Sequence, residues 1–130
     1  MKKSFLAMII AVSMLALLSG CTDNIGSIEG STVRFVNGRA RMTILTASME
    51  PALPMGSEVI VREAGSNTIE IGDVITFMVN PGVAITHRVI DIIEDYEDTG
   101  MWAFQTKGDA NAIPDAEMVL AANVVGIVVE

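Results

Sequence analysis

Residues 73 to 93 read DVITFMVNPGVAITHRVIDII, which is two β-branched runs separated by turn residues. The first run, Asp73–Val79, ends at Asn80-Pro81-Gly82, and the second run, Val83–Ile93, follows directly. Val, Ile, Thr and Phe favour pleated, half-buried strands, whereas Pro and Gly interrupt strands and favour turns. This segment therefore predicts two consecutive β-strands.

Similar short runs recur on both sides of this segment. They are Thr32–Val36, Arg41–Leu45, Glu58–Arg62, Met101–Thr106 and Val124–Val129. Asn37-Gly38, a dipeptide typical of tight hairpin turns, ends the first of them. After residue 22 no helical periodicity is sustained beyond about two turns, and only Asp115–Ala122 leaves room for a short helix or turn. We therefore expect residues 32–130 to form one mainly all-β domain, a small antiparallel sheet that is folded over or partly closed into a barrel.

The first 21 residues resemble an export signal. Lys2 and Lys3 precede an apolar run that ends at Leu18-Ser19-Gly20-Cys21, and this ending resembles the lipobox of bacterial lipoproteins. Cys21 is the only cysteine of the chain, so it cannot form an internal disulfide, and we predict that it is lipidated. The alternative is an uncleaved anchor, because residues 4–21 are just long enough to span a bilayer. Either arrangement tethers the domain to the cell membrane on the extracytoplasmic side, through a Gly/Ser-rich linker at residues 22–31.

The charge of the chain argues against nucleic acid as a partner. The chain carries 8 basic and 16 acidic residues, and two of the basic ones, Lys2 and Lys3, belong to the export segment. The remainder therefore has a net charge of −10. Such a surface repels phosphate groups, whose binding depends on clustered Lys and Arg.

Metal and cofactor chemistry is not indicated either. One histidine and one cysteine cannot form an imidazole–thiolate metal cluster, and no phosphate-loop or dinucleotide motif occurs. The acidic residues between 91 and 98 lack the spacing of an EF-hand, so we interpret them as a solvated hairpin tip. We expect no metal and no cofactor.

A serine and a histidine are the remaining route to catalysis. Ser48 lies in Thr46-Ala47-Ser48-Met49-Glu50-Pro51, after an apolar strand and before a proline that cannot continue a β-ladder. A serine on such a turn can present its hydroxyl at a fixed point, although most serines there only complete the turn. The lone His87 is equally ambiguous, because a histidine in a β-branched strand is more often a core or edge residue.

Several segments in this order resemble boxes of the type I signal peptidases. Residues 46–51 resemble the nucleophile box SGSMEP, 71–77 the GDVVxF strand, 86–89 the HRV segment, and 106–115 the box TKGDNNxxxD. The resemblance covers about residues 43 to 129. Bacterial members usually carry Lys at the position of His87, whereas endoplasmic-reticulum and archaeal members carry His. The chain resembles the second kind.

This resemblance implies a serine endopeptidase and a role for each matched residue. Ser48 matches the nucleophile and His87 the general base, since a histidine with an unperturbed pKa of about 6.5 can take and return a proton near neutral pH. Asp115 matches the residue that orients the base, and Asp109 is the second candidate for that role. The backbone N–H of Ser48 and the hydroxyl of Thr46 are the implied oxyanion donors.

Other residues in these boxes are interpreted as structural. Lys107 could serve a Ser-Lys dyad, but it lies in the third box and not at the Lys/His position. Glu50 is interpreted as part of the turn. Ala47 replaces the usual glycine between the two hydroxyl residues, and Ala110 replaces the first Asn of the third box.

We therefore predict a membrane-tethered serine endopeptidase that removes signal peptides from exported preproteins, with or without an accessory membrane subunit. A catalytically inactive lipoprotein of the same fold, binding an extended peptide or a partner protein, is the alternative. The related self-cleaving repressors use a lysine base and a DNA-binding domain. The histidine, the export signal and the acidic surface of this chain argue against that group.

Overall fold

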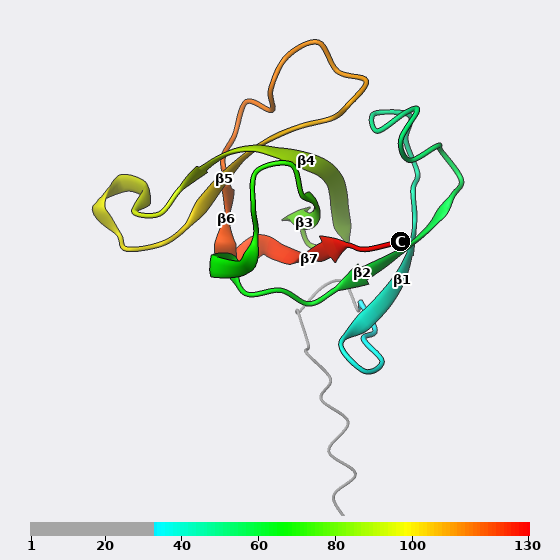
Figure 1. The fold of residues 1–130 in the computed structure, drawn as a ribbon, viewed down its shortest axis with the longest axis horizontal. Helices are drawn as coiled ribbons and strands as arrows, with labels where there is room; N and C mark the ends of the chain where they lie inside the picture. The colour runs from blue at the N-terminus through cyan, green and yellow to red at the C-terminus, as the bar shows by residue number, and fades with distance from the viewer. Residues whose placement is uncertain (1–32) are drawn as a thin grey trace, which may run out of the picture.

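The computed structural model describes residues 33–130. Within them the chain forms seven strands and three single-turn 3₁₀ segments (Figure 1). The strands are β1 (Arg39–Thr43), β2 (Glu58–Arg62), β3 (Val74–Asn80), β4 (Val83–Ile93), β5 (Ala103–Lys107), β6 (Val119–Leu120) and β7 (Val124–Val128). The 3₁₀ segments are η1 (Ser66–Thr68), η2 (Tyr96–Asp98) and η3 (Ala121–Asn123). The predicted export segment 1–21 with Cys21, and the linker 22–31, lie outside the described residues.

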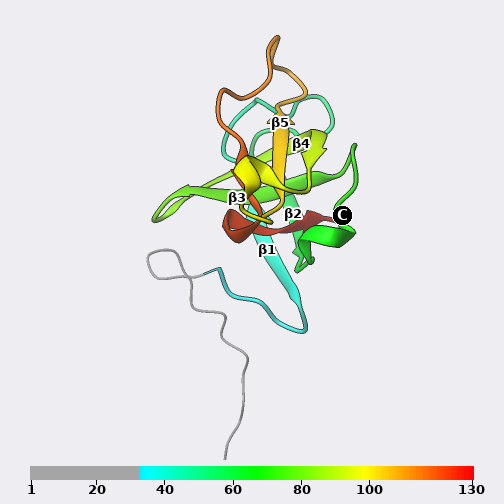
Figure 2. The same ribbon diagram turned by 90° about the vertical axis from the view of Figure 1, so that its left-hand side faces the viewer.

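All seven strands belong to one antiparallel sheet, in the order β1-β2-β7-β3-β4-β5-β6. The sheet curves strongly, as the two perpendicular views show (Figures 1 and 2). It does not close, because β1 and β6 are the two edge strands. The predicted all-β, antiparallel, folded-over architecture is confirmed, in its open form. Within residues 33–130, no helix has the length and apolar character needed to cross a membrane.

The two strands predicted from residues 73–93 form the centre of the sheet. β3 and β4 pair antiparallel over six residue pairs, among them Ile75 opposite His87. The turn between them contains Gly82, whose positive φ of 83° is a conformation that glycine adopts without strain. Ile75 and Phe77 of β3 and Val89 of β4 are buried, which places one face of this hairpin in the core.

The apolar interior consists of two clusters. The larger has seven buried members, Ile69, Ile75, Phe77, Val89, Phe104, Val119 and Ile127. The smaller has four, Ile44, Val59, Val61 and Val125. The larger cluster takes its buried strand residues from β3 to β7, and the smaller takes its members from β2, β7 and Ile44, which follows β1.

Two predicted strands, Thr32–Val36 and Arg41–Leu45, differ from the structure. Thr32–Val36 was expected to be a strand, but in its described part only Val36 forms a single bridge, to Arg39, around a turn at Asn37-Gly38. β1 begins beyond this turn, where Arg39 first pairs with β2. It ends at Thr43 because the Ile44 carbonyl accepts a hydrogen bond from Gly56 N, while Ser57 N bonds Pro54 O within the loop. The segment Asp115–Ala122 holds bends, the short strand β6 and the start of η3. No longer helix forms there because Val119 and Leu120 pair with β5.

Candidate active site

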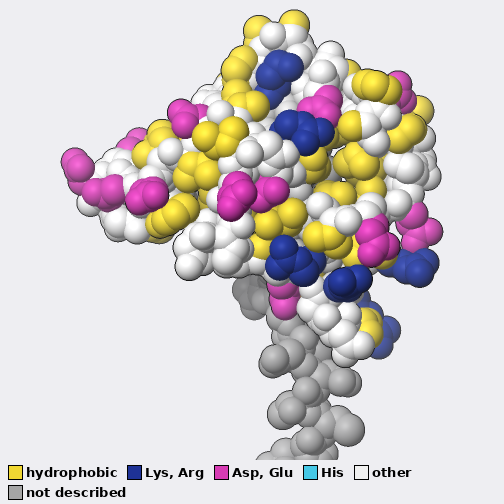
Figure 3. Space-filling model, in the orientation of Figure 1, with side chains coloured by type: hydrophobic (Ala, Val, Ile, Leu, Met, Phe, Trp, Pro, Cys, Tyr) yellow, Lys and Arg dark blue, Asp and Glu magenta, His cyan; other side chains and the backbone are white. Residues whose placement is uncertain are grey.

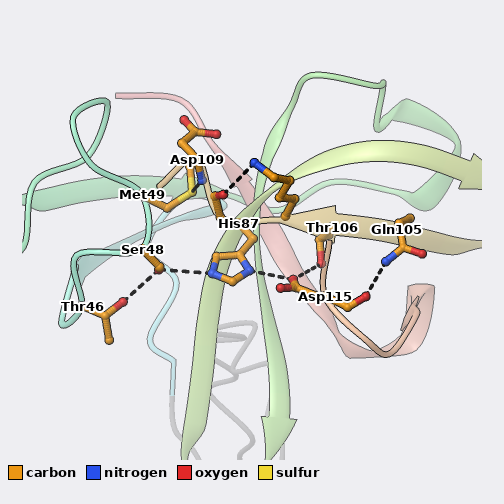
Figure 4. A network of polar contacts seen from close by, with 10 residues as sticks. Thr46, Ser48, Met49, His87, Gln105, Thr106, Asp109 and Asp115 are labelled. Carbon is orange, nitrogen blue, oxygen red and sulfur yellow. Dashed lines mark hydrogen bonds and ion pairs between the residues drawn. The ribbon is translucent and has the colours of Figure 1, made fainter. Parts of the chain in front are cut away.

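Three separate elements bring Ser48, His87 and Asp115 together (Figure 4). Ser48 lies in the loop between β1 and β2, His87 in β4, and Asp115 in the loop between β5 and β6. The imidazole Nε2 of His87 is 3.1 Å from Ser48 Oγ, and its Nδ1 is 2.6 Å from Asp115 Oδ2. These side chains form one continuous hydrogen-bonded row although 39 and 28 residues separate them in the sequence.

The loop that carries Ser48 is closed at its base and folded on itself. Hydrogen bonds from Gly56 N to Ile44 O (2.7 Å) and from Ile44 N to Ser57 O (2.9 Å) close the base. Met49 is only 1% exposed, and it anchors the loop while its neighbour Ser48 stays partly accessible. Because a fully buried methionine makes many dispersion contacts, this anchor restricts the position of the serine backbone.

His87 is held on the regular ladder of β4. Its side chain is nearly buried, and its ring lies edge-on to Phe77, with the centroids 6.4 Å apart and the planes at 71°. An ionised carboxylate can only accept hydrogen bonds, so next to ionised Asp115 the Nδ1 of His87 carries a proton. In the neutral ring, Nε2 is then left as an acceptor for the Ser48 hydroxyl.

Asp115 is held by two residues of β5. Its Oδ2 accepts a hydrogen bond from Thr106 Oγ1 at 2.6 Å, and its backbone N–H donates to Thr106 O at 2.8 Å. Gln105 Nε2 donates to the carbonyl of Asp115 at 2.6 Å. Sequence reasoning did not single out Gln105 or the hydroxyl of Thr106. The only signal for them was position: Thr106 is the first residue of the third box, and Gln105 immediately precedes it.

Asp109 lies elsewhere in the site. Its carboxylate accepts two hydrogen bonds from the Arg88 guanidinium, at 2.9 and 2.7 Å, and Arg88 also donates to Gly72 O at 2.8 Å. The hydrogen bond from Arg88 holds the pKa of Asp109 below its ordinary value, against the opposing effect of burial, and the same pair raises the pKa of Arg88. The Nδ1 of His87 is bonded to Asp115 and not to Asp109.

The backbone around Asp109 supports the nucleophile loop. Ala110 N donates to Ser48 O at 2.9 Å, and Asp109 N contacts the Met49 sulfur at 3.4 Å. Gly108 packs so closely that a Cβ at this position would lie 2.7 Å from Ser48 O and 3.0 Å from His87 Nε2. The third box therefore contacts both the serine and the histidine.

Curated proteins of known class are similar to this chain. Signal peptidase I W of Bacillus subtilis (strain 168) is 39% identical over 90 residues, which cover 68% of this chain and 46% of that protein. The signal peptidase complex catalytic subunit SEC11C of Homo sapiens is 35% identical over 75 residues, which cover 57% of this chain and 38% of that protein. The chain belongs to the type I signal peptidase family. The family predicted from the boxes is thus confirmed.

This type I signal peptidase homologue spans less than half the length of the curated relatives that it matches. No protein-family model matches the chain.

The other residues considered from the sequence have separate places in this signal peptidase homologue. Thr46 Oγ1 lies 3.0 Å from Ser48 Oγ, with either hydroxyl able to donate. Lys107 Nζ contacts the carbonyl of Gly108 at 3.5 Å, and Glu50 Oε1 accepts from the backbone of Met55 at 3.4 Å within the loop. Thr46 alone of these three contacts the serine hydroxyl directly.

Of the acidic residues between 91 and 98, Asp91 lies in β4 and the others lie in the β4–β5 connection. Acidic side chains gather at the projecting tip on the left of Figure 3, where this connection lies in the same orientation of Figure 1. The acidic residues of the connection are exposed, and Asp95 Oδ1 accepts a hydrogen bond from Gly100 N at 2.6 Å. Among residues 33–130, no group of three or more His, Cys, Asp or Glu side chains could hold a metal ion.

Proposed function

We propose that this chain is a membrane-tethered serine endopeptidase that removes signal peptides from exported preproteins. The observation that carries this proposal is the hydrogen-bonded row from Ser48 through His87 to Asp115, in a homologue of signal peptidases. A nucleophile, a base within hydrogen-bond reach and a third group that orients the base are the elements of serine peptidase chemistry.

In the proposed mechanism, Ser48 Oγ attacks the carbonyl carbon of the scissile bond while His87 Nε2 takes the hydroxyl proton. Asp115 stabilises the imidazolium that forms and keeps Nδ1 protonated. The tetrahedral intermediate then collapses, and Nε2 returns the proton to the departing amine, leaving the peptide acyl group on Ser48. A water molecule, deprotonated by the same nitrogen, hydrolyses this ester and regenerates the serine.

The developing oxyanion needs hydrogen-bond donors close to Ser48, and we propose the Ser48 N–H and the Thr46 hydroxyl. Among residues 33–130, no carbonyl or side chain accepts a hydrogen bond from the Ser48 N–H. Thr46 Oγ1, at 3.0 Å from Ser48 Oγ, is close enough to rotate toward an oxygen bound at the attacked carbon. Removing one such donor typically costs about 2.7–4 kcal/mol of transition-state stabilisation.

The proposed substrate is an extended peptide, cut after small residues at the positions flanking the bond and bound by strand addition beside Ser48. The proposed location is the extracytoplasmic side of the cell membrane, with the anchor at residues 4–21 or a lipid on Cys21. Two observations support this: the relatives are named as signal peptidases, and the N-terminal sequence has the features of an export signal.

The test is cleavage of a membrane-reconstituted preprotein with an Ala-x-Ala site by the full-length chain. Ser48→Ala and His87→Ala are each expected to lower kcat by at least about a thousandfold, since both take part in the same proton transfer. Ser66→Ala, in η1, is the matched control and should cleave like the native chain. Mass spectrometry of the products identifies the bond that is cut.

Two outcomes contradict the proposal. If the native chain cleaves nothing in the membrane, or if Ser48→Ala cleaves as well as the native chain, Ser48 is not a nucleophile for this substrate. The inactive peptide-binding lipoprotein then becomes the better account. Binding of the uncleaved preprotein by both variants would support that account.

A further inference from the structure

The carboxylate of Asp115 receives two hydrogen bonds on the same oxygen. Oδ2 is 2.6 Å from His87 Nδ1 and 2.6 Å from Thr106 Oγ1. Toward an ionised carboxylate the threonine hydroxyl can act only as a donor. Figure 4 shows Thr106 and His87 meeting this carboxylate from different sides. Thr106 therefore restricts where the acceptor of the histidine proton can lie.

The loop that carries Asp115 has no regular secondary structure to impose this orientation. Residues 108–118 contain no helix or strand, and the Asp115 side chain is 25% exposed. The backbone of Asp115 is held by Thr106 O and by the Gln105 side chain, but these bonds leave the carboxylate free to rotate about its side-chain bonds. The Thr106 hydroxyl is the contact that selects the rotamer facing His87.

The position of Thr106 itself is set by the sheet. Thr106 pairs with Val89 across β4 and β5, and directly opposed residues on neighbouring strands point to the same face. Val89 and His87 are two residues apart on β4, so they share that face too. Thr106 is fully buried, which excludes water as a competing acceptor for its hydroxyl. A rigid strand thus holds the donor that aligns a side chain on a loop.

We propose that Thr106 is a positioning residue that holds Asp115 Oδ2 on His87 Nδ1, and so keeps the neutral imidazole in the tautomer whose Nε2 lone pair faces Ser48. This inference rests on the proposed function for its catalytic consequence. Without the hydroxyl, Asp115 samples rotamers that no longer bind Nδ1–H. The imidazole then populates the Nε2–H tautomer, which cannot accept the serine proton.

The single histidine of the chain makes the tautomer directly measurable. The full-length protein, carrying an affinity tag without histidine, is labelled with ¹⁵N-histidine, and its two ring-nitrogen shifts are recorded at a pH where the neutral imidazole dominates. Thr106→Ser and Thr106→Ala are the central comparison, because they differ only in the hydroxyl. Thr106→Val preserves the side-chain volume, and Asp115→Ala defines the state without the carboxylate.

A matched control comes from β3. Thr76 is also fully buried, and its hydroxyl is bonded to Thr86 at 2.8 Å and not to Asp115. Thr76→Val therefore removes a buried hydroxyl from the same sheet without removing a contact to the carboxylate. It should leave the histidine tautomer as it is in the native chain.

We expect the ratio of the Nδ1–H to the Nε2–H tautomer to fall about tenfold in Thr106→Ala and Thr106→Val, the effect of losing one hydrogen bond to a charged group. Thr106→Ser should keep the native ratio. An unchanged ratio in both hydroxyl-deleting variants overturns the inference. A fall of the same size in Thr106→Ser or Thr76→Val also overturns it, because packing would then be responsible.

Cleavage assays give an independent measurement. Thr106→Ala is expected to lower kcat about tenfold with KM unchanged, and Thr106→Ser should restore most of the rate. A native kcat in Thr106→Ala overturns the catalytic part of the inference. If the native chain shows no Ser48-dependent cleavage, the proposed function fails, whereas the tautomer ratios still decide whether Thr106 positions Asp115.

Discussion

The histidine and the serine of the site lie on parts of the molecule that are built differently. His87 belongs to a strand that shares six residue pairs with β3 and lies beside the larger apolar cluster. Ser48 belongs to a loop beside the smaller cluster, and β2 joins the rest of the sheet through two residue pairs with β7 and two backbone hydrogen bonds of Ile60 to residues 129 and 130. The base is thus placed by a ladder and the nucleophile by a loop. We infer that the geometry of the site depends more on how the Ser48 loop packs against its neighbours than on the geometry of strand β4.

Few contacts join these two parts at the site. Three contacts cross the junction between the nucleophile loop and the rest of the site. They are the backbone hydrogen bond from Ala110 to Ser48, the contact of Asp109 N with the Met49 sulfur, and the hydrogen bond between Ser48 and His87. The segment 108–110 therefore acts as the surface on which the nucleophile loop rests. Changes in the clusters should act on stability, and changes in this segment should act on activity.

The largest expected effect is in the larger cluster. Phe104 is fully buried, and Phe104→Ala should lower the free energy of unfolding by about 3–5 kcal/mol, because it removes a large apolar side chain and leaves a cavity. Urea unfolding followed by Trp fluorescence measures the change.

Ile44→Ala is the counterpart in the smaller cluster, at the base of the nucleophile loop. It should cost about 2–5 kcal/mol, nearer the low end because the loop beside it can relax. If Ile44→Ala lowered the free energy of unfolding as much as Phe104→Ala or more, the expectation that the smaller cluster relaxes more easily than the larger one would be contradicted.

Gly108→Ala should separate activity from stability. The new Cβ would lie within 3.0 Å of Ser48 O, Asn111 Nδ2 and His87 Nε2, so the serine and the histidine must move apart. A displacement of about 1 Å costs on the order of a hundredfold in rate. We expect kcat/KM for the preprotein to fall about a hundredfold.

The control for this variant is Gly72→Ala, since no atom lies within 4 Å of a Cβ built at Gly72. The positive φ of Gly72 makes that variant strained, so it should lose stability while keeping the site intact. If Gly108→Ala were as active as the native chain, the site would tolerate a displacement of Ser48 relative to His87.

The Arg88–Asp109 pair should appear in the dependence of stability on pH. Because Arg88 lowers the pKa of Asp109, the pair contributes stability that is fully present above the ordinary carboxyl pKa of about 4, and this contribution is lost as the pH falls through the lowered value. Asp109→Asn should be about 1 kcal/mol less stable at pH 7, a discounted value because Arg88 is 36% exposed. In urea titrations, the difference in the free energy of unfolding between the native chain and Asp109→Asn should become smaller below pH 4.

If this difference in the free energy of unfolding stayed constant from pH 7 to pH 2, this account of the pair would be contradicted. That result would mean that Asp109 contributes by packing and not by its charge.

The smallest effect is expected at an exposed ion pair on β1 and β2, the two strands that flank the loop carrying Ser48. Arg41 and Glu58 form an ion pair at 3.1 Å across β1 and β2, with side chains that are 77% and 60% exposed. Glu58→Gln should change the free energy of unfolding by less than about 0.5 kcal/mol, because exposed pairs are screened by water and salt. A loss above 1 kcal/mol in urea titration would show that the β1–β2 ladder depends on surface charge.

The sequence predicted most strands well, because their side-chain pattern is local. β2 and β4 have the bounds expected from their β-branched runs, and the turn at Asn37-Gly38 is present. The expected strand at Thr32–Val36 was wrong in its described part, because a strand also needs a partner, and only Val36 has one. Pairing partners distant in the chain cannot be read from a local pattern.

By itself the sequence determined the family, the all-β class and the residue types available for chemistry, since these depend on composition, local pattern and the matched boxes. The tertiary structure alone decided which aspartate meets His87. Asp109 and Asp115 both lie in the third box, but one binds Arg88 and the other binds the imidazole together with Thr106. Hydrogen bonds require placement within a few tenths of an ångström, and only the register of β4 on β5 and the path of the following loop set such distances.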